Sequence, residues 1–540
     1  MRLEEIKLQT SPFLEKYVNG DEDAVGFFDY KEPFNRSALS MRQQELKQYT
    51  FPRNDLTEYL DSYNHRIGTS DQTRNNIDKL KNSDGLAVVG GQQAGLLSGP
   101  LLVIYKCIST IQLAKQAERE LGVPVAPVFW IAGEDHDMDE INHVRVPKND
   151  TAKKISLKAA TSVKSSASLW EWNPDDVKPW LHYVFRSFGE TAFTNDFLAQ
   201  TERLLYESDS IVTFFAKLLS NWFSKEGLIL LDAGDPAFKK LQSKFLERMI
   251  RNNVNIDHAF KTQTKNLNEA GFTDPIEVQE NNAHLFYTKN GERILLFRNG
   301  NGFTSKEEDF SISEEELLRE AKRSPEKFSN NVVTRPLMQE FLLPTLSFIA
   351  GPGEISYWAS LGKIFHHFER KMPVLMPRLS ITLVSGRINS LLSSKELKVE
   401  QVLEEGTDKY KRNWFNVNRP VETNDSIEAV RSDIVKSYSQ LVKLAEEIDP
   451  KLLPVTEQNL NRILSEVSYI EHKMEQRVRQ KVKVPLAEFD EIMLELKPGG
   501  VLQERVWNVY QYLNEEGSDL IKDLLEYPYC FNEKHKIVYL

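Results

Sequence analysis

Short apolar runs bounded by glycines alternate with longer amphipathic segments through the middle of the chain, from about residue 84 to residue 384. The first run, Gly85–Gly90, is continuously apolar between its glycines, which is typical of a buried strand. Pro100 favours a helix start, residues 101–121 carry a long apolar face, and a second apolar run follows at 123–132. Strand, loop, helix and strand in this order predict a βαβ unit and therefore a parallel sheet.

The same pattern returns further along the chain. Strands are predicted at 227–232 and 346–350, and an extended segment at 374–384 closes the series. Asn290-Gly291 separates two alternating runs and predicts a hairpin with a type I′ turn. We therefore predict an α/β fold in which residues 1–384 form a Rossmann-like, doubly wound parallel sheet with a mostly helical N-terminal segment and inserted connecting subdomains.

From about Ser385 the chain becomes charged, helical and nearly free of glycine. Apolar residues recur at spacings of three and four in two arms, which Asp449-Pro450 separates; they are Ile427, Val430, Ile434, Leu441, Leu444 and Ile448, then Leu460, Ile463, Val467, Ile470, Met474, Val478 and Val482. This pattern predicts an antiparallel helical coiled coil over 385–496, with 497–540 returning to the core. A two-helix hairpin buries little surface alone, so we expect a homodimer through it; docking against the chain's own core is the alternative.

Composition narrows the function classes. The chain has 540 residues, two cysteines and a net charge of −11, from 68 Lys and Arg against 79 Asp and Glu. The acidic balance argues against a nucleic-acid-binding protein, and two cysteines cannot build a disulfide framework. No apolar stretch reaches the roughly 18 to 20 residues that cross a bilayer, and the charged N-terminus does not resemble a signal peptide. We expect a cytoplasmic protein that does not bind membranes.

The glycine-punctuated loop over 90–100 leaves a predicted strand and enters a predicted helix, which is where open α/β sheets bind ligands. Its candidate substrate-binding residues are Gly91, Gln92, Gln93, Ser98 and Gly99. Glycines allow close approach to a ligand, and a helix N-terminus favours an anion. The loop matches neither standard phosphate motif, because Leu96-Leu97 stands where a P-loop has Lys and Ser or Thr. A tight turn that serves only the backbone is the alternative.

A cluster of acids around an imidazole follows the second predicted strand. Asp135, His136 and Asp137 are candidate catalytic residues, because they could bind an amine or move protons, and Glu134 is a candidate for substrate binding. His136 is the preferred general base, since its ordinary pKa lies near neutrality. One of the aspartates could instead cap the next helix. Nothing in the sequence fixes a coordination geometry, so no resident metal site is predicted.

Two further groups of residues are candidates. Arg335 could hold a carboxylate in a bidentate pair, and Glu354 and Tyr357 follow Gly351-Pro352-Gly353 at the end of another predicted strand. A second anion site, for a nucleotide, could form where the coiled coil begins and returns; its candidate residues are Ser385, Gly386, Arg387, Asp490, Arg505 and Trp507. A plain helix cap at Ser385 is the alternative.

Five motifs occur in one order along the chain: GGQQAGLLSGP, PVFWIAGEDHDMDEINHV, SPEKFSNNVVTRPLMQE, IAGPGEISYWA and PGGVLQER. Together they resemble the BshC family, the cysteine-adding enzymes of bacillithiol synthesis, over essentially the whole chain. The resemblance implies a Rossmann-type core related to class I aminoacyl-tRNA synthetases and nucleotidyltransferases, and a coiled coil used for dimerisation. It also implies a ligase that joins the carboxyl group of L-cysteine to the amine of glucosaminyl-malate.

That reaction needs an activated carboxyl group, because an amine does not displace hydroxide from a carboxylate at neutral pH. ATP with Mg²⁺ is the expected activator, through an acyl-adenylate. The synthetases have a histidine-rich first motif, whereas this loop has Gln92, Gln93 and Ser98 but no histidine. The nucleotide could therefore lie at this loop or at the second anion site. A nonenzymatic coiled-coil adaptor whose core senses a nucleotide or metabolite is the competing function.

Overall fold

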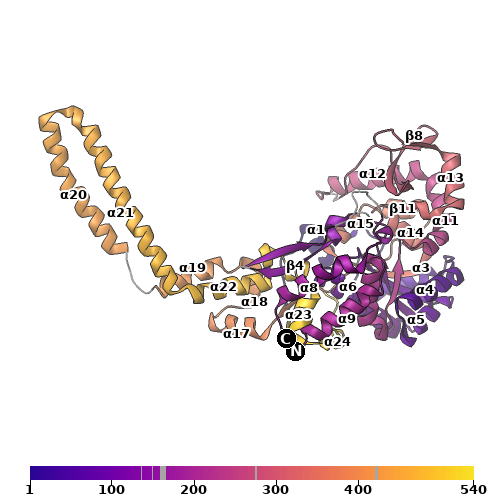
Figure 1. Cartoon of the computed structure of the whole chain (residues 1–540). Coiled ribbons are helices and arrows are strands. Elements are labelled where there is room, and N and C mark those ends of the chain that lie inside the picture. The colour runs from indigo at the N-terminus through magenta and orange to yellow at the C-terminus, as the bar shows by residue number, and fades with distance from the viewer. Residues whose placement is uncertain (136, 149, 159–165, 274–275, 420–423) are drawn as a thin grey trace. The chain divides into compact units, whose positions relative to one another are not determined.

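The structure, a computed structural model, describes residues 1–135, 137–148, 150–158, 166–273, 276–419 and 424–540. The chain forms two compact units (Figure 1). The first unit contains Met1–Ser385 and Val501–Leu540, and the second contains Gly386–Gly500. No helix in the described ranges is long and apolar enough to cross a membrane.

The first unit is built on a five-stranded parallel sheet in the order β13-β12-β2-β3-β6, which confirms the predicted doubly wound fold. Its strands are β2 (Leu86–Gln92), β3 (Val125–Ile131), β6 (Ile229–Asp232), β12 (Thr345–Ala350) and β13 (Val374–Pro377). From β2 the chain adds β3 and β6 on one side, and then β12 and β13 on the other. The order thus reverses between β2 and β12, and ligands of open α/β sheets bind beyond the carboxyl ends of the strands at such a point.

Helices cover both faces of this sheet. The N-terminal helices are α1 (Pro12–Asn19), α2 (Glu22–Val25), α3 (Arg36–Leu46), α4 (Arg53–Ile67) and α5 (Asp71–Lys81), and α6 (Leu101–Leu121) connects β2 to β3. Apolar residues of α3 and α6 pack with Leu86 and Val88 in one hydrophobic core. Trp130, whose side chain lies on the face opposite Val125, packs edge-on against Phe238 of α11 (Pro236–Arg251).

Two insertions interrupt the sheet. Between β3 and β6 lie α7 (Met138–Ile141), β4 (His143–Lys148), β5 (Thr151–Ser156), α8 (Pro174–Phe188), α9 (Thr194–Tyr206) and α10 (Ile211–Phe223). Between β6 and β12 lie α11, α12 (Asn253–Glu269), β7 (Asn282–Lys289), β8 (Glu292–Asn299), β9 (Gly302–Thr304), β10 (Ser311–Ser313), α13 (Glu314–Arg323), β11 (Phe328–Asn330) and α14 (Thr334–Leu342). Positive φ angles at Asn290 (53°) and Gly291 (83°) form the turn of the predicted β7–β8 hairpin.

The extended segment predicted at 374–384 contains two strands that belong to different sheets. β13 joins the core sheet, whereas β14 (Ile381–Val384) pairs with β15 (His535–Tyr539). The extended segment is interrupted at Arg378, between β13 and β14. The buried guanidinium of Arg378 forms an ion pair with Glu504 at 2.6 Å. After β12 the chain forms α15 (Pro352–Trp358) and α16 (Gly362–His367), and after Glu504 it forms α23 (Val509–Glu516) and α24 (Leu520–Glu526).

The N-terminal segment, predicted to be mostly helical, also contains a strand, β1 (Arg2–Ile6), which pairs antiparallel with β15. The two ends of the chain therefore lie side by side (Figure 1). A five-residue strand with mixed polar and apolar positions resembles any charged terminus in sequence, so its partner more than 500 residues away gives it no local signal.

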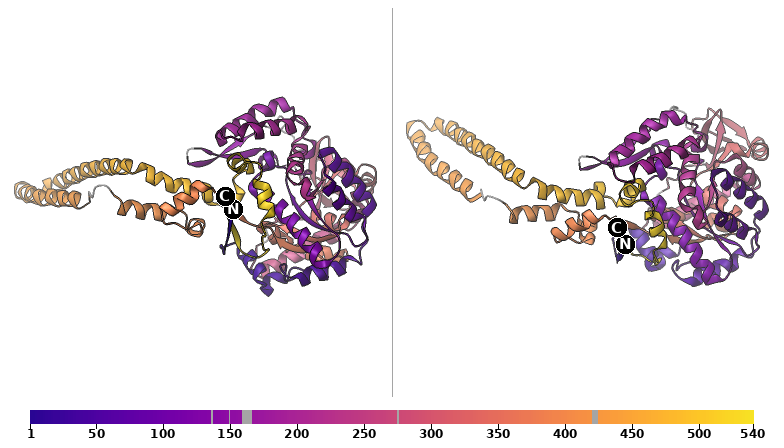
Figure 2. Two further views of the ribbon diagram at one scale, coloured as in Figure 1. Left: turned by 90° about the horizontal axis from the view of Figure 1, so that it is seen from below. Right: turned by 60° about the horizontal axis from the view of Figure 1, so that its bottom comes forward.

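The second unit consists of helices. They are α17 (Gly386–Ser394), α18 (Val399–Glu405), α19 (Asp408–Val417), α20 (Asn424–Ile448), α21 (Leu453–Lys481) and α22 (Lys483–Leu496). α20 and α21 lie alongside each other as the predicted antiparallel arms (Figures 1 and 2).

The seam between these arms differs from the predicted apolar stripe. The half-buried residues of the described part of α20 are Ile427, Arg431, Ile434, Tyr438, Val442 and Ala445, and Arg431 forms an ion pair with Glu471 of α21 at 2.7 Å. Of the apolar residues predicted for the seam, Val430, Leu441, Leu444, Ile448, Ile470 and Met474 are exposed. The hairpin thus has one internal seam and a second apolar stripe that faces solvent.

Candidate active site

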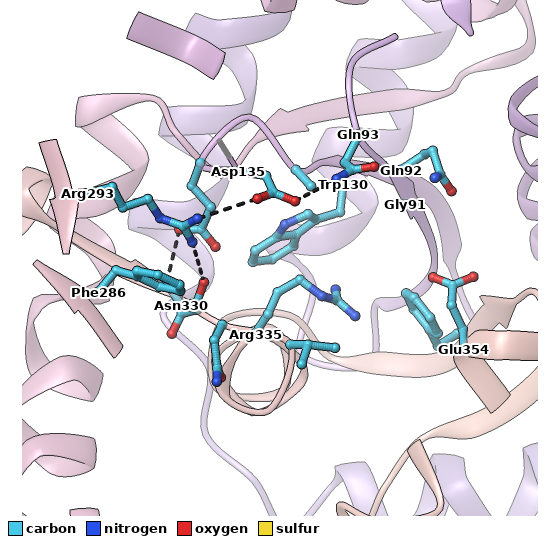
Figure 3. Close-up of a pocket in the computed structure, with 15 residues that line it drawn as sticks. Gly91, Gln92, Gln93, Trp130, Asp135, Phe286, Arg293, Asn330, Arg335 and Glu354 are labelled. Carbon is cyan, nitrogen blue, oxygen red and sulfur yellow. Dashed lines mark hydrogen bonds and ion pairs between the residues drawn. The ribbon is translucent and has the colours of Figure 1, made fainter. Parts of the chain in front are cut away.

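A cavity of about 360 Å³ lies at the carboxyl ends of the core strands, where the strand order reverses (Figure 3). A volume of this size suits a small-molecule substrate. The cavity is lined by Gly91, Gln92, Gln93, Trp130, Ala132, Glu134, Asp135, Phe286, Arg293, Asn330, Asn331, Val332, Arg335, Phe348 and Glu354.

Part of the glycine-punctuated loop forms one wall of this cavity. A Cβ atom at Gly91 would lie 2.7 Å from the carbonyl oxygen of Trp130, so only glycine lets β2 end so close to β3. Gln92 and Gln93 follow and line the cavity. Ser98 is fully buried, and neither Ser98 nor Gly99 lines this cavity.

The second half of the loop packs against the segment that returns from the coiled coil. The backbone N–H of Leu101, the first residue of α6, donates to the carbonyl of Trp507 at 2.8 Å. The side-chain amide of Asn508 donates to the carbonyls of Leu97 and Gly99, each at 2.8 Å. The first N–H of α6 is therefore occupied by a protein carbonyl, where the sequence suggested an anion.

Lys106 links its own helix, α6, to the end of β2 and to α15. Its ammonium donates to the carbonyl of Gly91 at 2.8 Å and to Oε1 of Gln92 at 3.0 Å, and it lies 2.5 Å from the Glu354 carboxylate. Burial lowers the pKa of Lys106, while the Glu354 carboxylate opposes that shift. Because Lys106 holds Oε1 of Gln92, the amide N–H groups of Gln92 remain available as donors.

The carboxylates after β3 are engaged by cations and amides. Glu134 forms a buried ion pair with Lys239 of α11. Asp135 accepts from the Gln93 amide at 2.6 Å through one oxygen and lies 3.4 Å from the Arg293 guanidinium through the other. Arg293 itself lies 3.7 Å from the centre of the Phe286 ring, and burial lowers its pKa (Figure 3).

Arg335 extends from the first turn of α14 into the middle of the residues that line the cavity (Figure 3). Its guanidinium donates to Oε1 of Gln339 at 3.2 Å and to the Tyr357 hydroxyl at 3.3 Å, and it lies over the Phe348 ring at 5.2 Å. Its partners are thus neutral, and no carboxylate among the described residues forms an ion pair with it. The structure brings Arg335 and Glu354 to the same cavity as Gln92 and Asp135, and Tyr357 contacts Arg335 without lining that cavity.

Several residues of this site were not predicted from the sequence. They are Lys106, Trp130, Lys239, Phe286, Arg293, Asn330 and Asn331. A lysine within the apolar face of a predicted core helix was a usable signal for Lys106, because a buried lysine requires a partner. Arg293 gave no such signal, since it lies in a hairpin whose orientation toward the core sheet is set by tertiary packing.

Of the predicted catalytic residues that the structure describes, Asp135 lines the cavity and Asp137 does not. His136 lies outside the described residues. Asp137 is exposed at the N-cap position of α7, where its side chain makes no capping hydrogen bond.

The six residues suggested for a second anion site are divided between the two units. Arg387 pairs with Glu491, and Asp490 pairs with Lys411 at 2.6 Å, all within the helical unit that begins at Gly386. Ser385 and Trp507 are buried in the first unit. Arg505, also in the first unit, is exposed and lines another cavity.

That second cavity, of about 350 Å³, lies on the other side of the glycine loop, and Gln92 and Gln93 line both cavities. Its basic side chains come from β4 and from the returning segment; they are His143, Arg145 and Arg505. Burial, and then the charges of Lys154 and Arg145, lower the pKa of His143. This favours the neutral form of His143, whereas Arg145 and Arg505 keep their positive charge.

Comparisons with known proteins agree with this architecture. Residues 1–379 match the family described as "Bacillithiol biosynthesis BshC, N-terminal Rossmann-like domain", and residues 381–540 match "Bacillithiol biosynthesis BshC, C-terminal coiled-coil domain". Curated relatives named "Putative cysteine ligase BshC" include a protein of Bacillus licheniformis, 38% identical over 541 residues. Two others, from Bacillus cereus and Bacillus thuringiensis, are each 37% identical over 540 residues. All three alignments cover 100% of this chain and 100% of the relative.

Proposed function

This chain belongs to the BshC family of bacillithiol biosynthesis, and we propose that it is a ligase that joins the carboxyl group of L-cysteine to the amine of glucosaminyl-malate. The reaction forms one C–N bond and releases one carboxyl oxygen of cysteine together with a proton of the amine. The site must therefore bind carboxylates, accept an amine and exclude water from an activated carboxyl group.

The observation that carries this proposal is that two carboxylates at the cavity are paired with lysines, whereas one arginine at the cavity has no carboxylate partner among the described residues. Glu134 and Glu354 are neutralised by Lys239 and Lys106, whereas Arg335 contacts only neutral groups among the described residues. A half-buried guanidinium without a carboxylate partner favours an anionic ligand, and its planar donors match a carboxylate. We assign Arg335 to a malate carboxylate of glucosaminyl-malate, with the amide N–H groups of Gln92 as further donors at the same cavity.

The amine would bind on the opposite side of the cavity, near Asp135. The Asp135 carboxylate is half-buried at the cavity wall, and a carboxylate accepts hydrogen bonds through both of its oxygens. We propose that Asp135 orients the amine and that His136, its neighbour in sequence, accepts the proton that the amine loses. Asp137 is the third member of this proposed group.

Activation of the cysteine carboxyl group is assigned to ATP. ATP would convert the oxygen that the amine displaces into part of a leaving group: an acyl-adenylate would form with release of pyrophosphate, and AMP would carry that oxygen away. Arg145 and Arg505 suit its phosphates, and Glu140 at the same cavity suits a Mg²⁺ ion that the phosphates bring. Gln92 and Gln93 separate this cavity from the first one, so they would position the carboxyl group between nucleotide and amine. The enzyme would work in the reducing cytoplasm, which keeps Cys107 and Cys530 as thiols.

The test is mass-spectrometric detection of bacillithiol from purified protein, L-cysteine and glucosaminyl-malate, with and without ATP and Mg²⁺. We expect product only with ATP, and no product from His136→Ala. For Arg335→Met we expect the KM for glucosaminyl-malate to rise by about tenfold to a hundredfold, because a hydrogen bond to a charged group contributes about 1.5–3 kcal/mol. Arg251→Met, which removes an exposed arginine of α11, is the matched control.

Other outcomes separate the parts of the proposal. Product without ATP would remove the activation step and leave the assignment of Arg335 in place. Retained binding of glucosaminyl-malate with no product under any condition would overturn the ligase and favour a metabolite-sensing adaptor.

A further inference from the structure

His284 occupies an irregular position in β7, close to the cavity but not at its surface. The pairing of β7 with β8 shifts register between Asn282 and Phe286, and His284 has a φ of +55° while its side chain is only 2% exposed. Positive φ is uncommon for a residue other than glycine, and bulges near active sites redirect side chains. The Asn282 side chain holds this turn by accepting the His284 N–H at 2.8 Å.

Both ring nitrogens of His284 contact other elements. Nε2 lies 3.3 Å from the carboxylate of Asp257 in α12, and Nδ1 lies 3.2 Å from the amide nitrogen of Asn331, which lines the cavity. Thr334, the first residue of α14, donates its hydroxyl to the His284 carbonyl at 2.6 Å.

The hydrogen bonds of Asn331 determine the tautomer of this ring. Its Oδ1 accepts the backbone N–H groups of Val333 at 2.9 Å and Thr334 at 3.2 Å, so its amide nitrogen must face His284. An amide nitrogen only donates, so Nδ1 of His284 is the acceptor and the ring proton lies on Nε2, toward Asp257. The order of donation is therefore Asn331 to His284 to Asp257.

This chain of hydrogen bonds ends at the start of the helix that carries Arg335. The carbonyl of Asn331 accepts the backbone N–H of Arg335 at 2.9 Å, and its side chain caps the two preceding N–H groups. The guanidinium of Arg335 has only longer bonds, of 3.2 and 3.3 Å, to neutral partners. Its place in the cavity therefore depends on where α14 begins.

We propose that His284, held by Asp257, is a positioning residue that orients Asn331 and, through it, sets the carboxylate-binding position of Arg335. This inference rests on the proposed carboxylate site. It requires the neutral ring, because a proton added to Nδ1 would face the N–H groups of Asn331. The charged groups around the ring are Asp257, its ion-pair partner Lys261 at 2.9 Å, and Glu280, which pairs with Lys261 at 3.0 Å; the Phe260 ring packs against it.

The test compares His284→Leu with His284→Asn. Leucine removes the acceptor, whereas the Oδ1 of asparagine can replace Nδ1, and asparagine also tolerates positive φ. For His284→Leu we expect the KM for glucosaminyl-malate to rise by about tenfold to a hundredfold, with kcat much less affected. For His284→Asn we expect KM to return to within about threefold of the wild type. His366→Leu, an exposed histidine paired with Asp29, is the matched control.

The rescue of KM by asparagine, with kcat much less affected in either variant, is a readout that a merely structural role would not move. Equal defects in the Leu and Asn variants, with thermal unfolding unchanged in both, would overturn the inference, and so would an unchanged KM in His284→Leu.

Calorimetric titration with glucosaminyl-malate alone separates this inference from the proposed ligase. Binding without turnover in the wild type, weakened in His284→Leu and restored in His284→Asn, would support the positioning role although the ligase had failed. Absence of binding by the wild type would overturn both.

Discussion

Asp232 is a carboxyl group whose protonation is controlled by its surroundings. It ends β6, is almost completely buried, and accepts hydrogen bonds from the Ser168 hydroxyl at 2.9 and 3.0 Å and from the Gly234 N–H at 2.8 Å. Burial outweighs these bonds and raises its pKa to about 7. Ser168 also donates its backbone N–H to the Gly133 carbonyl at 2.9 Å, so this carboxyl group holds part of the first insertion against the loop that carries Glu134 and Asp135.

The raised pKa of Asp232 predicts how stability depends on pH. The folded state keeps the proton up to about pH 7, whereas an unfolded aspartic acid releases it near pH 4, so the folded state binds more protons in this window. The free energy of unfolding should therefore fall as pH rises through the window, by up to about 1.4 kcal/mol per pH unit from this group.

Asp232→Asn tests this dependence, because asparagine keeps an acceptor and does not titrate. We expect its stability relative to the wild type to improve between pH 4 and pH 7, measured by urea unfolding at several pH values. Asp196→Asn, at an exposed position in α9, controls for the loss of one carboxylate. A constant difference between Asp232→Asn and wild type across the window would contradict the prediction.

The candidate site was partly predictable from single residues. Gly91, Gln92, Asp135 and Glu354 follow predicted strands, and the structure gathers them at one cavity with Arg335, which the sequence offered as a carboxylate-binding candidate. Residues whose role depends on tertiary pairing were not predictable: His284 lies in a bulge, and its hydrogen-bond partners lie 27 and 47 residues away. Sequence spacing carries no information about such contacts.

At the scale of elements, α3 shows how a peripheral helix is fixed to the core sheet by one buried charge. Arg42 is fully buried and pairs with both oxygens of Glu340 at 2.7 Å. It also donates to the carbonyls of Thr345 and Lys371, each at 3.0 Å. One side chain of α3 thus reaches α14, the start of β12 and the segment before β13.

Arg42→Met should leave the Glu340 carboxylate buried without its cation. We expect a loss of about 3–5 kcal/mol in the free energy of unfolding, measured by urea denaturation. Arg36→Met, on the same helix but exposed, should change it by less than about 0.5 kcal/mol. Similar losses in both variants would contradict the assignment of stability to the buried pair.

Strong local patterns predicted elements well. Helix α6, the β7–β8 turn and both coiled-coil arms agree with the sequence because apolar periodicity and turn residues act within a few residues. The separation of β13 from β14 was not predictable, because it depends on the pair between Arg378 and Glu504, 126 residues apart. Each arm of the coiled coil carries apolar residues at the internal seam and others that are exposed. The spacing of apolar residues alone therefore could not show which of them belong to the seam.

At the scale of the whole molecule, the outer apolar stripe of the helical unit predicts association. Leu441, Leu444 and Ile448 on α20 are 50%, 52% and 68% exposed, and Ile470 and Met474 on α21 are 51% and 46% exposed. Large apolar side chains that are exposed along both arms favour burial against a second copy. We therefore expect a homodimer formed through the coiled coil.

The double variant Leu441→Lys and Leu444→Lys should shift the protein to monomers in sedimentation velocity experiments, because it places two charges in that stripe. Ser439→Lys, on the polar surface of the same helix, should leave the dimer intact. A wild type that sediments as a monomer at micromolar concentration would contradict the expected dimer.

The pairing of β1 with β15 also has a consequence during synthesis on the ribosome. Residues 2–6 emerge more than 500 residues before residues 535–539, and they acquire their partner only when those residues have been made. At roughly 5–20 residues per second, β1 waits about half a minute to two minutes with its backbone groups unpaired. A chain that stops short of residue 535 leaves both β1 and β14 without the strand that lies between them. Codons 535–539 therefore decide whether this sheet forms at all, and a chain that ends before them exposes two strand edges to chaperones and proteases.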